Sequence, residues 1–128
     1  MKIKTTKAPP TWYVPEFGGN RDAVEQFAVL ITPMTVAEAN AAQDARLRRV
    51  KAGANPADIA RKIRDDAIVS HVDAVEGIAG EDGTKVSNGS ELVKLVGMAA
   101  DASLSGLLDE IYGAIESQSK LSEGERKN

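Results

Sequence analysis

The chain has 128 residues and a formal net charge of −3, a length that suits one domain with a hydrophobic core of its own. Hydrophobic residues make up 42% of the sequence and aromatic residues only 4%, so the core must be built from Ala, Val, Ile and Leu, a composition that favours helices over a sandwich or barrel. The chain has no cysteine, which excludes disulfides, thiolate nucleophiles and thiolate metal sites.

The first ten residues are basic, but no apolar segment follows them, so we do not expect a secretory signal peptide. The longest apolar run is Phe27–Ile31, which is far too short to cross a bilayer. The sequence therefore predicts a protein that does not act in a membrane.

Residues 1–20 are predicted to form an extended N-terminal arm, because prolines and glycines recur throughout the segment. The arm carries three of the five aromatic residues of the chain, namely Trp12, Tyr13 and Phe17. These side chains can anchor the arm to its own domain as a strand, or they can dock it on another subunit. The sequence leaves both interpretations open.

Residues 21–119 are predicted to form a single, mainly helical α+β domain. Residues 24–31 have strand character and precede Pro33. Thr35 and Glu38 have the spacing of a capping box, which predicts a helix over residues 36–52 that ends at Gly53.

A second helix is predicted from about residue 57 to residue 68. Asn55 is a typical N-cap, and Pro56 suits the first helical position. The segment that follows, residues 68–78, reads equally well as a continued helix or as a strand, because its apolar spacing fits both.

Residues 75–89 are rich in glycine and acidic side chains, which raises the question of a bound ion or phosphate. The spacing of these residues matches neither a calcium loop nor a phosphate-binding loop. Asp82-Gly83 instead suits a tight turn between two extended segments. Ser87 or Ser90 is expected to cap a helix that begins near Glu91.

Two amphipathic helices are predicted after this turn, followed by a polar C-terminal tail over residues 120–128. The second helix is expected to bury its apolar stripe, either within the monomer or in an oligomer. The candidate partner-binding residues are this stripe and the aromatic side chains of the arm: Trp12, Tyr13, Phe17, Leu104, Leu107, Leu108, Ile111 and Ile115.

The sequence offers no clear catalytic or metal-binding constellation. His71 is the only histidine, so a metal site would need carboxylates alone, and none are spaced for it. Ser70, His71 and Asp73 do not form a triad if they lie in one extended segment, because adjacent side chains there point to opposite faces. We expect a protein that is not an enzyme and binds no cofactor.

A helix-turn-helix over residues 55–75 is an alternative, since residues 46–64 hold seven basic residues and one acid. The turn at residues 64–66 lacks the common glycine. The would-be reading helix carries Asp66, Asp73 and Glu76 and has no Arg, Asn or Gln to contact base edges. These features argue against nucleic-acid binding.

From residue 70 onward the sequence resembles the tail assembly chaperones of long-tailed bacteriophages. The pattern comprises a valine-rich segment, a Glu-Gly step, an Asp-Gly turn, a polar cap and a leucine-bearing helix. It continues into the C-terminal stretch LLDEIYGAIESQSKLSEGERKN. The residues that carry the first part of it are Val72, Val75, Glu76, Gly77, Ile78, Asp82, Gly83, Val86, Leu92 and Leu95.

This resemblance implies a protein of the host cell cytoplasm that binds the tape measure protein, keeps its apolar helices soluble and helps to recruit tail tube subunits before it leaves the finished tail. It is compatible with a homo-oligomer. A small structural tail or connector protein, which stays in the particle, is the main alternative.

Overall fold

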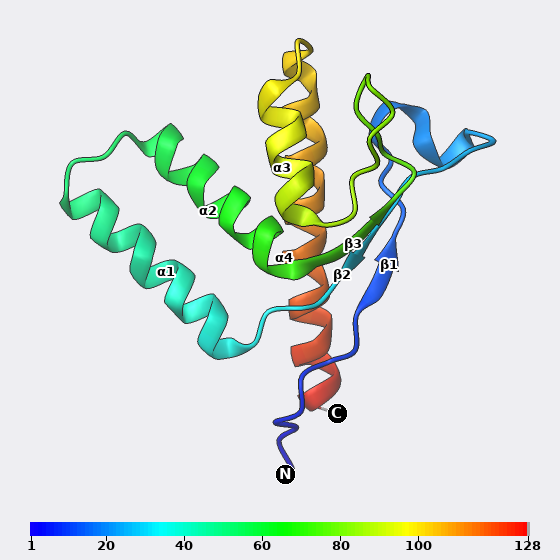
Figure 1. Ribbon diagram of the computed structural model, residues 1–128. Helices are drawn as coiled ribbons and strands as arrows, with labels where there is room; N and C mark the ends of the chain where they lie inside the picture. The colour runs from blue at the N-terminus through cyan, green and yellow to red at the C-terminus, as the bar shows by residue number, and fades with distance from the viewer. Residues whose placement is uncertain (128) are drawn as a thin grey trace.

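The computed structural model describes the backbone of residues 1–127 and the side chains of residues 1–120. The fold is α+β and mainly helical, as the sequence predicts, with a short N-terminal β portion followed by helices (Figure 1). In chain order the elements are β1 (Thr11–Tyr13), the 3-10 helix η1 (Phe17–Asp22), β2 (Ala28–Ile31), α1 (Val36–Lys51), α2 (Pro56–His71), β3 (Val72–Glu76), α3 (Gly89–Met98), the 3-10 helix η2 (Ala102–Leu104) and α4 (Ser105–Lys127).

The three strands form one antiparallel sheet in the order β1-β2-β3. In the central strand β2, Val29 and Ile31 are fully buried, while the residues between them are only partly covered. This alternation is typical of a strand with one face on the core. Residues 24–26, which were expected to continue this strand, are exposed and lie outside it.

The N-terminal arm lies back on its own domain, which is one of the two interpretations left open by the sequence. Trp12 of β1 pairs with Leu30 of β2, and Pro15 and Asn20 are buried. Asn20 donates to the backbone oxygens of Pro15 and Phe27, both at 2.9 Å, and accepts from the Phe27 amide at 2.8 Å. This amide side chain closes the loop between η1 and β2.

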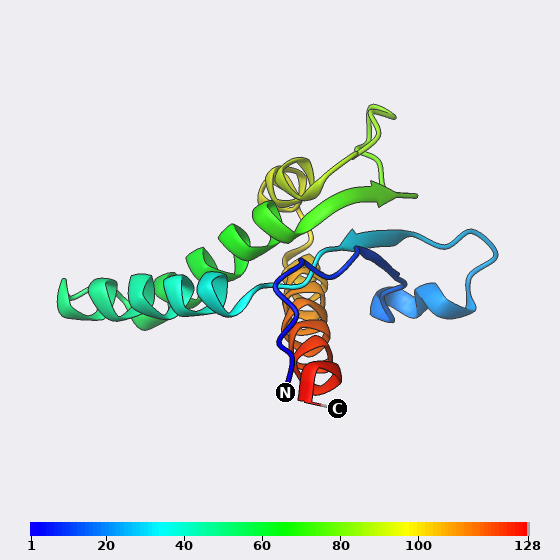
Figure 2. The same cartoon turned by 90° about the horizontal axis from the view of Figure 1, so that it is seen from below.

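The first two helices begin where their capping signals predict. Thr35 accepts from the Glu38 amide, and the Glu38 carboxylate accepts from the Thr35 amide, so the capping box is complete. Asn55 caps α2 with Pro56 in its first turn. The two helices form a hairpin that projects from the body of the molecule (Figure 2).

The ambiguous segment after Ile68 divides into a helix end and a strand. Helix α2 continues to His71, and Val72 then starts β3, which pairs with β2. The predicted turn also forms: Gly83 has φ +84°, a left-handed conformation that favours glycine, and Ala79 pairs with Lys85 across it. The predicted serine cap is wrong, because Asn88 caps α3 by accepting from the Glu91 amide at 3.0 Å.

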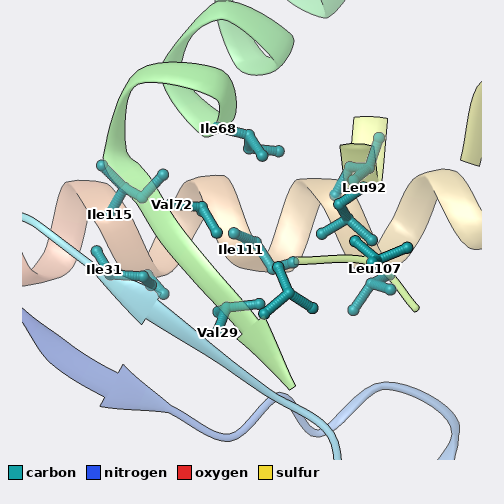
Figure 3. Close-up of a cluster of buried hydrophobic side chains, with 12 residues drawn as sticks. Val29, Ile31, Ile68, Val72, Leu92, Leu107, Ile111 and Ile115 are labelled. Carbon is teal, nitrogen blue, oxygen red and sulfur yellow. The ribbon is translucent and has the colours of Figure 1, made fainter. Parts of the chain in front are cut away.

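The core lies where α4 crosses the sheet and meets α2 and α3 (Figures 1 and 3). Helix α4 runs on to Lys127, so the backbone of residues 120–127, which the sequence assigns to a polar tail, is helical, and Asn128 lies outside the described residues. The buried side chains come from every layer: Val29, Ile31, Ile68, Val72, Val75, Val86, Leu92, Leu107, Leu108, Ile111, Ala114 and Ile115.

Candidate functional site

The described surface has an open, mostly apolar groove of about 880 Å³, which we call the α3 groove. It lies between α3, the loop over residues 78–82, and the segment that joins α3 to α4. Its principal apolar side chains come from all three parts: Ile78, Leu92, Leu95, Val96, Met98, Leu104 and Leu107.

Three local features give the groove its shape. Leu92 is buried at the floor and anchors α3 to the core, while Met98 is 78% exposed at the open end. Gly80 brings the loop close to α3, since a Cβ atom there would lie 3.5 Å from Leu95 Cδ1. Asp101 starts η2 by accepting from the Ser103 amide at 2.9 Å, and this turns the chain back along the groove.

The charged residues that line the groove, Glu81, Asp82 and Asp101, are all acidic. The hydrogen bond from the Thr84 amide lowers the pKa of Asp82, and the hydrogen bonds from Ser103 lower the pKa of Asp101. Both carboxylates therefore stay ionised at neutral pH. The groove combines an apolar floor with a negatively charged rim.

The apolar stripe of α4, which the sequence predicts as a partner-binding surface, is mostly buried in the protein's own core. Leu107, Leu108, Ile111 and Ile115 are between 0% and 4% exposed, so the expectation that these residues are buried is confirmed. Leu108, Ile111 and Ile115 pack inside this chain and form no exposed surface in the fold, so the partner-binding role assigned to them stays an untested prediction. Leu107 and the half-buried Leu104 line the α3 groove instead.

The three aromatic candidates of the arm do not form one surface. Trp12 is 48% exposed on β1, which leaves it available to a partner. Phe17 is half-buried and packs against the core, and its ring lies near the first turn of α4 at Gly106. Tyr13 is also half-buried and points its hydroxyl towards α4.

A single carboxylate, that of Glu110 on α4, fastens the N-terminal segment. It accepts from the Tyr13 hydroxyl at 2.6 Å, from the Glu16 amide at 2.8 Å and from the Phe17 amide at 3.0 Å. Burial opposes ionisation of Glu110, but these hydrogen bonds together hold its pKa below the ordinary value. Burial and the bond to Glu110 raise the pKa of Tyr13 to about 12, so the phenol keeps its proton.

His71, the only histidine, ends α2 and contacts α1 and the residue that follows β2. It is 3% exposed, and its Nδ1 lies 2.9 Å from the Thr32 carbonyl oxygen, which can only accept, so Nδ1 carries a proton. Nε2 lies 3.4 Å from the Glu38 carboxylate. Ser70 precedes it on the helix and Asp73 accepts from Thr32, so the three residues do not converge on one atom, although the reason is not the extended segment that the sequence suggested.

The helix-turn-helix alternative is contradicted by the structure. Residues 64–66, where its turn was expected, lie inside the unbroken helix α2. Arg64 there is largely covered and binds Asp65 and Asp109, at 3.0 and 2.9 Å, so its charge is turned inward.

Within the part of the chain that the structure describes, no group of three or more His, Cys, Asp or Glu side chains is placed to hold a metal ion. No helix in that part has the length and apolar character needed to span a bilayer.

The sequence carried only part of the signal for the α3 groove. Leu92, Leu95 and Val96 are recognisable as one helical stripe, but the contribution of Ile78 and Met98 depends on the path of the connecting segments.

Comparisons of the chain with protein-family models, with curated proteins and with solved structures find no match. The function is therefore inferred from the chain's own residues and surfaces.

Proposed function

We propose that this protein is a tail assembly chaperone of a long-tailed bacteriophage, which binds the tape measure protein in the host cytoplasm and helps to recruit tail tube subunits without catalysing a reaction. The observation that carries the proposal is the α3 groove, with its apolar floor and open end. Amphipathic helices bind such grooves by inserting apolar side chains at helical spacing. A long helical tape measure protein presents many faces of this kind.

Part of the segment on which the family resemblance rests borders this groove, and this supports the proposal: Ile78 and Asp82 line it. Val75 and Val86 are buried in the core, and Asp82-Gly83 lies in the turn of the adjoining loop. Leu92 and Leu95 form part of the floor. The resemblance therefore concerns one continuous part of the fold.

The groove suits a partner that must later be released. Each apolar anchor side chain that enters the groove contributes about 1.5–3 kcal/mol when buried. The loss of translational and rotational freedom on association offsets part of this gain. We therefore expect a complex that forms at micromolar concentration and still dissociates, as a chaperone that leaves the finished tail requires.

A copurification experiment tests this proposal. The protein is coexpressed with the long helical protein encoded in a neighbouring reading frame, and the complex is captured through a tag on the latter. The Met98→Lys variant places a charge at the open end of the groove and should lose the complex. The Val24→Lys variant is the matched control, since Val24 is 103% exposed and lies in the loop between η1 and β2, so its complex should persist.

Absence of any complex at micromolar concentration would contradict the proposal, as would equal capture of Met98→Lys and wild-type protein. Mass spectrometry of purified particles separates the chaperone from a structural tail or connector protein. A chaperone should be missing from the particles, whereas a structural component is present in stoichiometric amounts.

A further inference from the structure

Helix α1 exposes an apolar face that no described residue of its own chain covers. None of its residues is buried, and Val36, Leu47 and Val50 are 51%, 50% and 56% exposed. At 100° per residue these three side chains fall within about 60° of one another on the helix. They form one apolar strip along α1, which we call the α1 strip.

The α1 strip faces away from the helix that supports α1. The opposite side of α1, with Ala41, Ala42 and Ala45, lines a small hollow of about 240 Å³ against α2. Because small residues occupy that contact, α1 lies on α2 with few large side chains between them. The large apolar side chains of α1 are turned outward instead.

Basic residues surround the end of the α1 strip. The last turn of α1 contains Arg48, Arg49 and Lys51, next to Leu47 and Val50. Arg49 is near Asp66 of α2 at 3.9 Å, while Arg48 and Lys51 are exposed. The end of α1 therefore presents apolar side chains with positive charges beside them.

This surface is complementary to the α3 groove, in which an apolar floor is bordered by Glu81, Asp82 and Asp101. We infer that the end of α1 in one copy of the chain docks in the α3 groove of a second copy. Leu47 and Val50 enter the groove beside Met98, and Lys51 and Arg48 meet the acidic rim. In the protein on its own, the occupant of the groove is thus a basic, apolar helix end of a second copy, which competes with the proposed tape measure helix for the same surface.

The two surfaces cannot meet within one copy. Helices α1 and α3 lie on opposite sides of α2, and α1 contacts α2 while the groove opens beyond α3 (Figure 1). Contact between them therefore requires two copies and joins unlike surfaces, a heterologous arrangement. This inference does not depend on the proposed chaperone function.

The contact is expected to be weak and sensitive to salt. A helix end in a groove buries less area than the roughly 1,200–2,000 Å² of a stable protein–protein interface. Its exposed charge pairs are screened as the ionic strength rises. Sedimentation velocity of the wild-type protein should show association that grows with concentration and falls at high salt.

Two complementary variants test the contact. The strip variant, Leu47→Asp with Val50→Asp, keeps an intact groove. The groove variant, Glu81→Lys with Met98→Lys, keeps an intact strip. Each should be monomeric alone, whereas an equimolar mixture should form a one-to-one dimer and nothing larger, because it contains one intact contact. All four positions are exposed, and circular dichroism verifies that both variants fold.

The control is Val24→Asp, which should associate like the wild type. The inference is overturned if the wild-type protein stays monomeric at all concentrations, if either variant associates like the wild type, or if the mixture gives no dimer. A monomeric wild-type protein that still binds the tape measure protein through Met98 would refute this inference and leave the proposed function intact.

Discussion

At the scale of single residues, Glu110 connects two parts of the chain that are far apart in sequence. Its two carboxylate oxygens accept three hydrogen bonds from the segment over residues 13–17. A carboxylate can do this because it has only acceptors. An amide of the same shape offers one oxygen, and its NH₂ group would face a donor.

Replacing Glu110 with Gln should therefore destabilise the protein by about 1–3 kcal/mol, the cost of leaving a partly buried donor without an acceptor. Urea denaturation measures the change. Glu116→Gln is the control, since Glu116 is exposed on the same helix. This variant should unfold at the same urea concentration as the wild type. An equal effect of both substitutions would show that Glu110 holds nothing in place.

The same carboxylate gives a pH dependence of defined sign. The pKa of Glu110 is lowered in the folded state, so its contribution to stability is complete above the pKa of the unfolded chain. That contribution is lost as the pH falls through the lower folded-state pKa. The stability difference between wild type and Glu110→Gln should be constant near neutral pH and shrink in acid. A difference that grows in acid would contradict this assignment.

Gly89 and Gly97 are both in α3 but differ in the room around them. A Cβ atom at Gly89 would lie 2.2 Å from the Ile68 carbonyl oxygen of α2, whereas nothing lies within 4 Å of one at Gly97. Gly89→Ala should cost about 3 kcal/mol or more, since the backbones must separate. Gly97→Ala should stabilise the helix by about 0.5–1 kcal/mol. Thermal melts of the two variants test this contrast, and a reversed order would refute it.

Among the features of the fold, the sequence predicts the local helix caps best. Thr35 with Glu38 and Asn55 with Pro56 are local signals, because each cap needs only residues a few positions apart. The cap of α3 was misassigned among three polar neighbours. Ser87 contacts the Glu91 carboxylate at 2.9 Å, while Asn88 bonds the Glu91 amide, and only the backbone path distinguishes them.

At the scale of elements, α4 is the helix on which the other layers pack. Leu108 is 2% exposed within the core cluster that Figure 3 shows. Leu108→Ala should lower the free energy of unfolding by about 2–5 kcal/mol, because it removes buried methyl groups and leaves a cavity. Leu47→Ala, at a half-exposed position, should change it by less than about 0.5 kcal/mol. A melt that Leu108→Ala leaves unchanged would contradict this placement of α4.

The change from α2 to β3 shows why some elements could not be predicted. Periodicity over residues 68–78 fits a helix and a strand alike. Tertiary pairing decides between them: Val72 lies opposite Ile31 and Val75 lies opposite Val29, so β2 captures the segment as a strand. His71 and Thr32 are joined at the same point by two contacts, both at 2.9 Å. None of these partners is near in sequence.

Helix α1 should be the least protected of the long helices. It has no buried residue and packs mainly on α2, so little apolar contact resists its local opening. Hydrogen exchange measured on dilute, monomeric protein should be faster in residues 36–51 than in residues 59–71, where Ile59, Ile68 and His71 are buried. Equal protection of both helices would contradict this.

At the scale of the whole molecule, the mainly helical α+β class followed from composition and spacing, but the α3 groove did not. Ile78, Leu95 and Leu104 come from a loop, a helix and a connecting segment. These side chains converge because the chain changes direction between α3 and α4, at η2. No local sequence pattern encodes that direction. The stripe of α4 was correctly expected to be buried, yet its strength also made it look like a binding surface.

The order of the elements along the chain has a consequence for synthesis. Helix α4 follows the strands and the other helices along the described chain and supplies Leu107, Leu108, Ile111, Ala114 and Ile115 to the core. On a ribosome, β2, β3 and α2 emerge before it, and their apolar faces stay uncovered until α4 follows. Folding must therefore wait until α4 has been translated. The nascent chain is most vulnerable to aggregation and proteolysis in that interval.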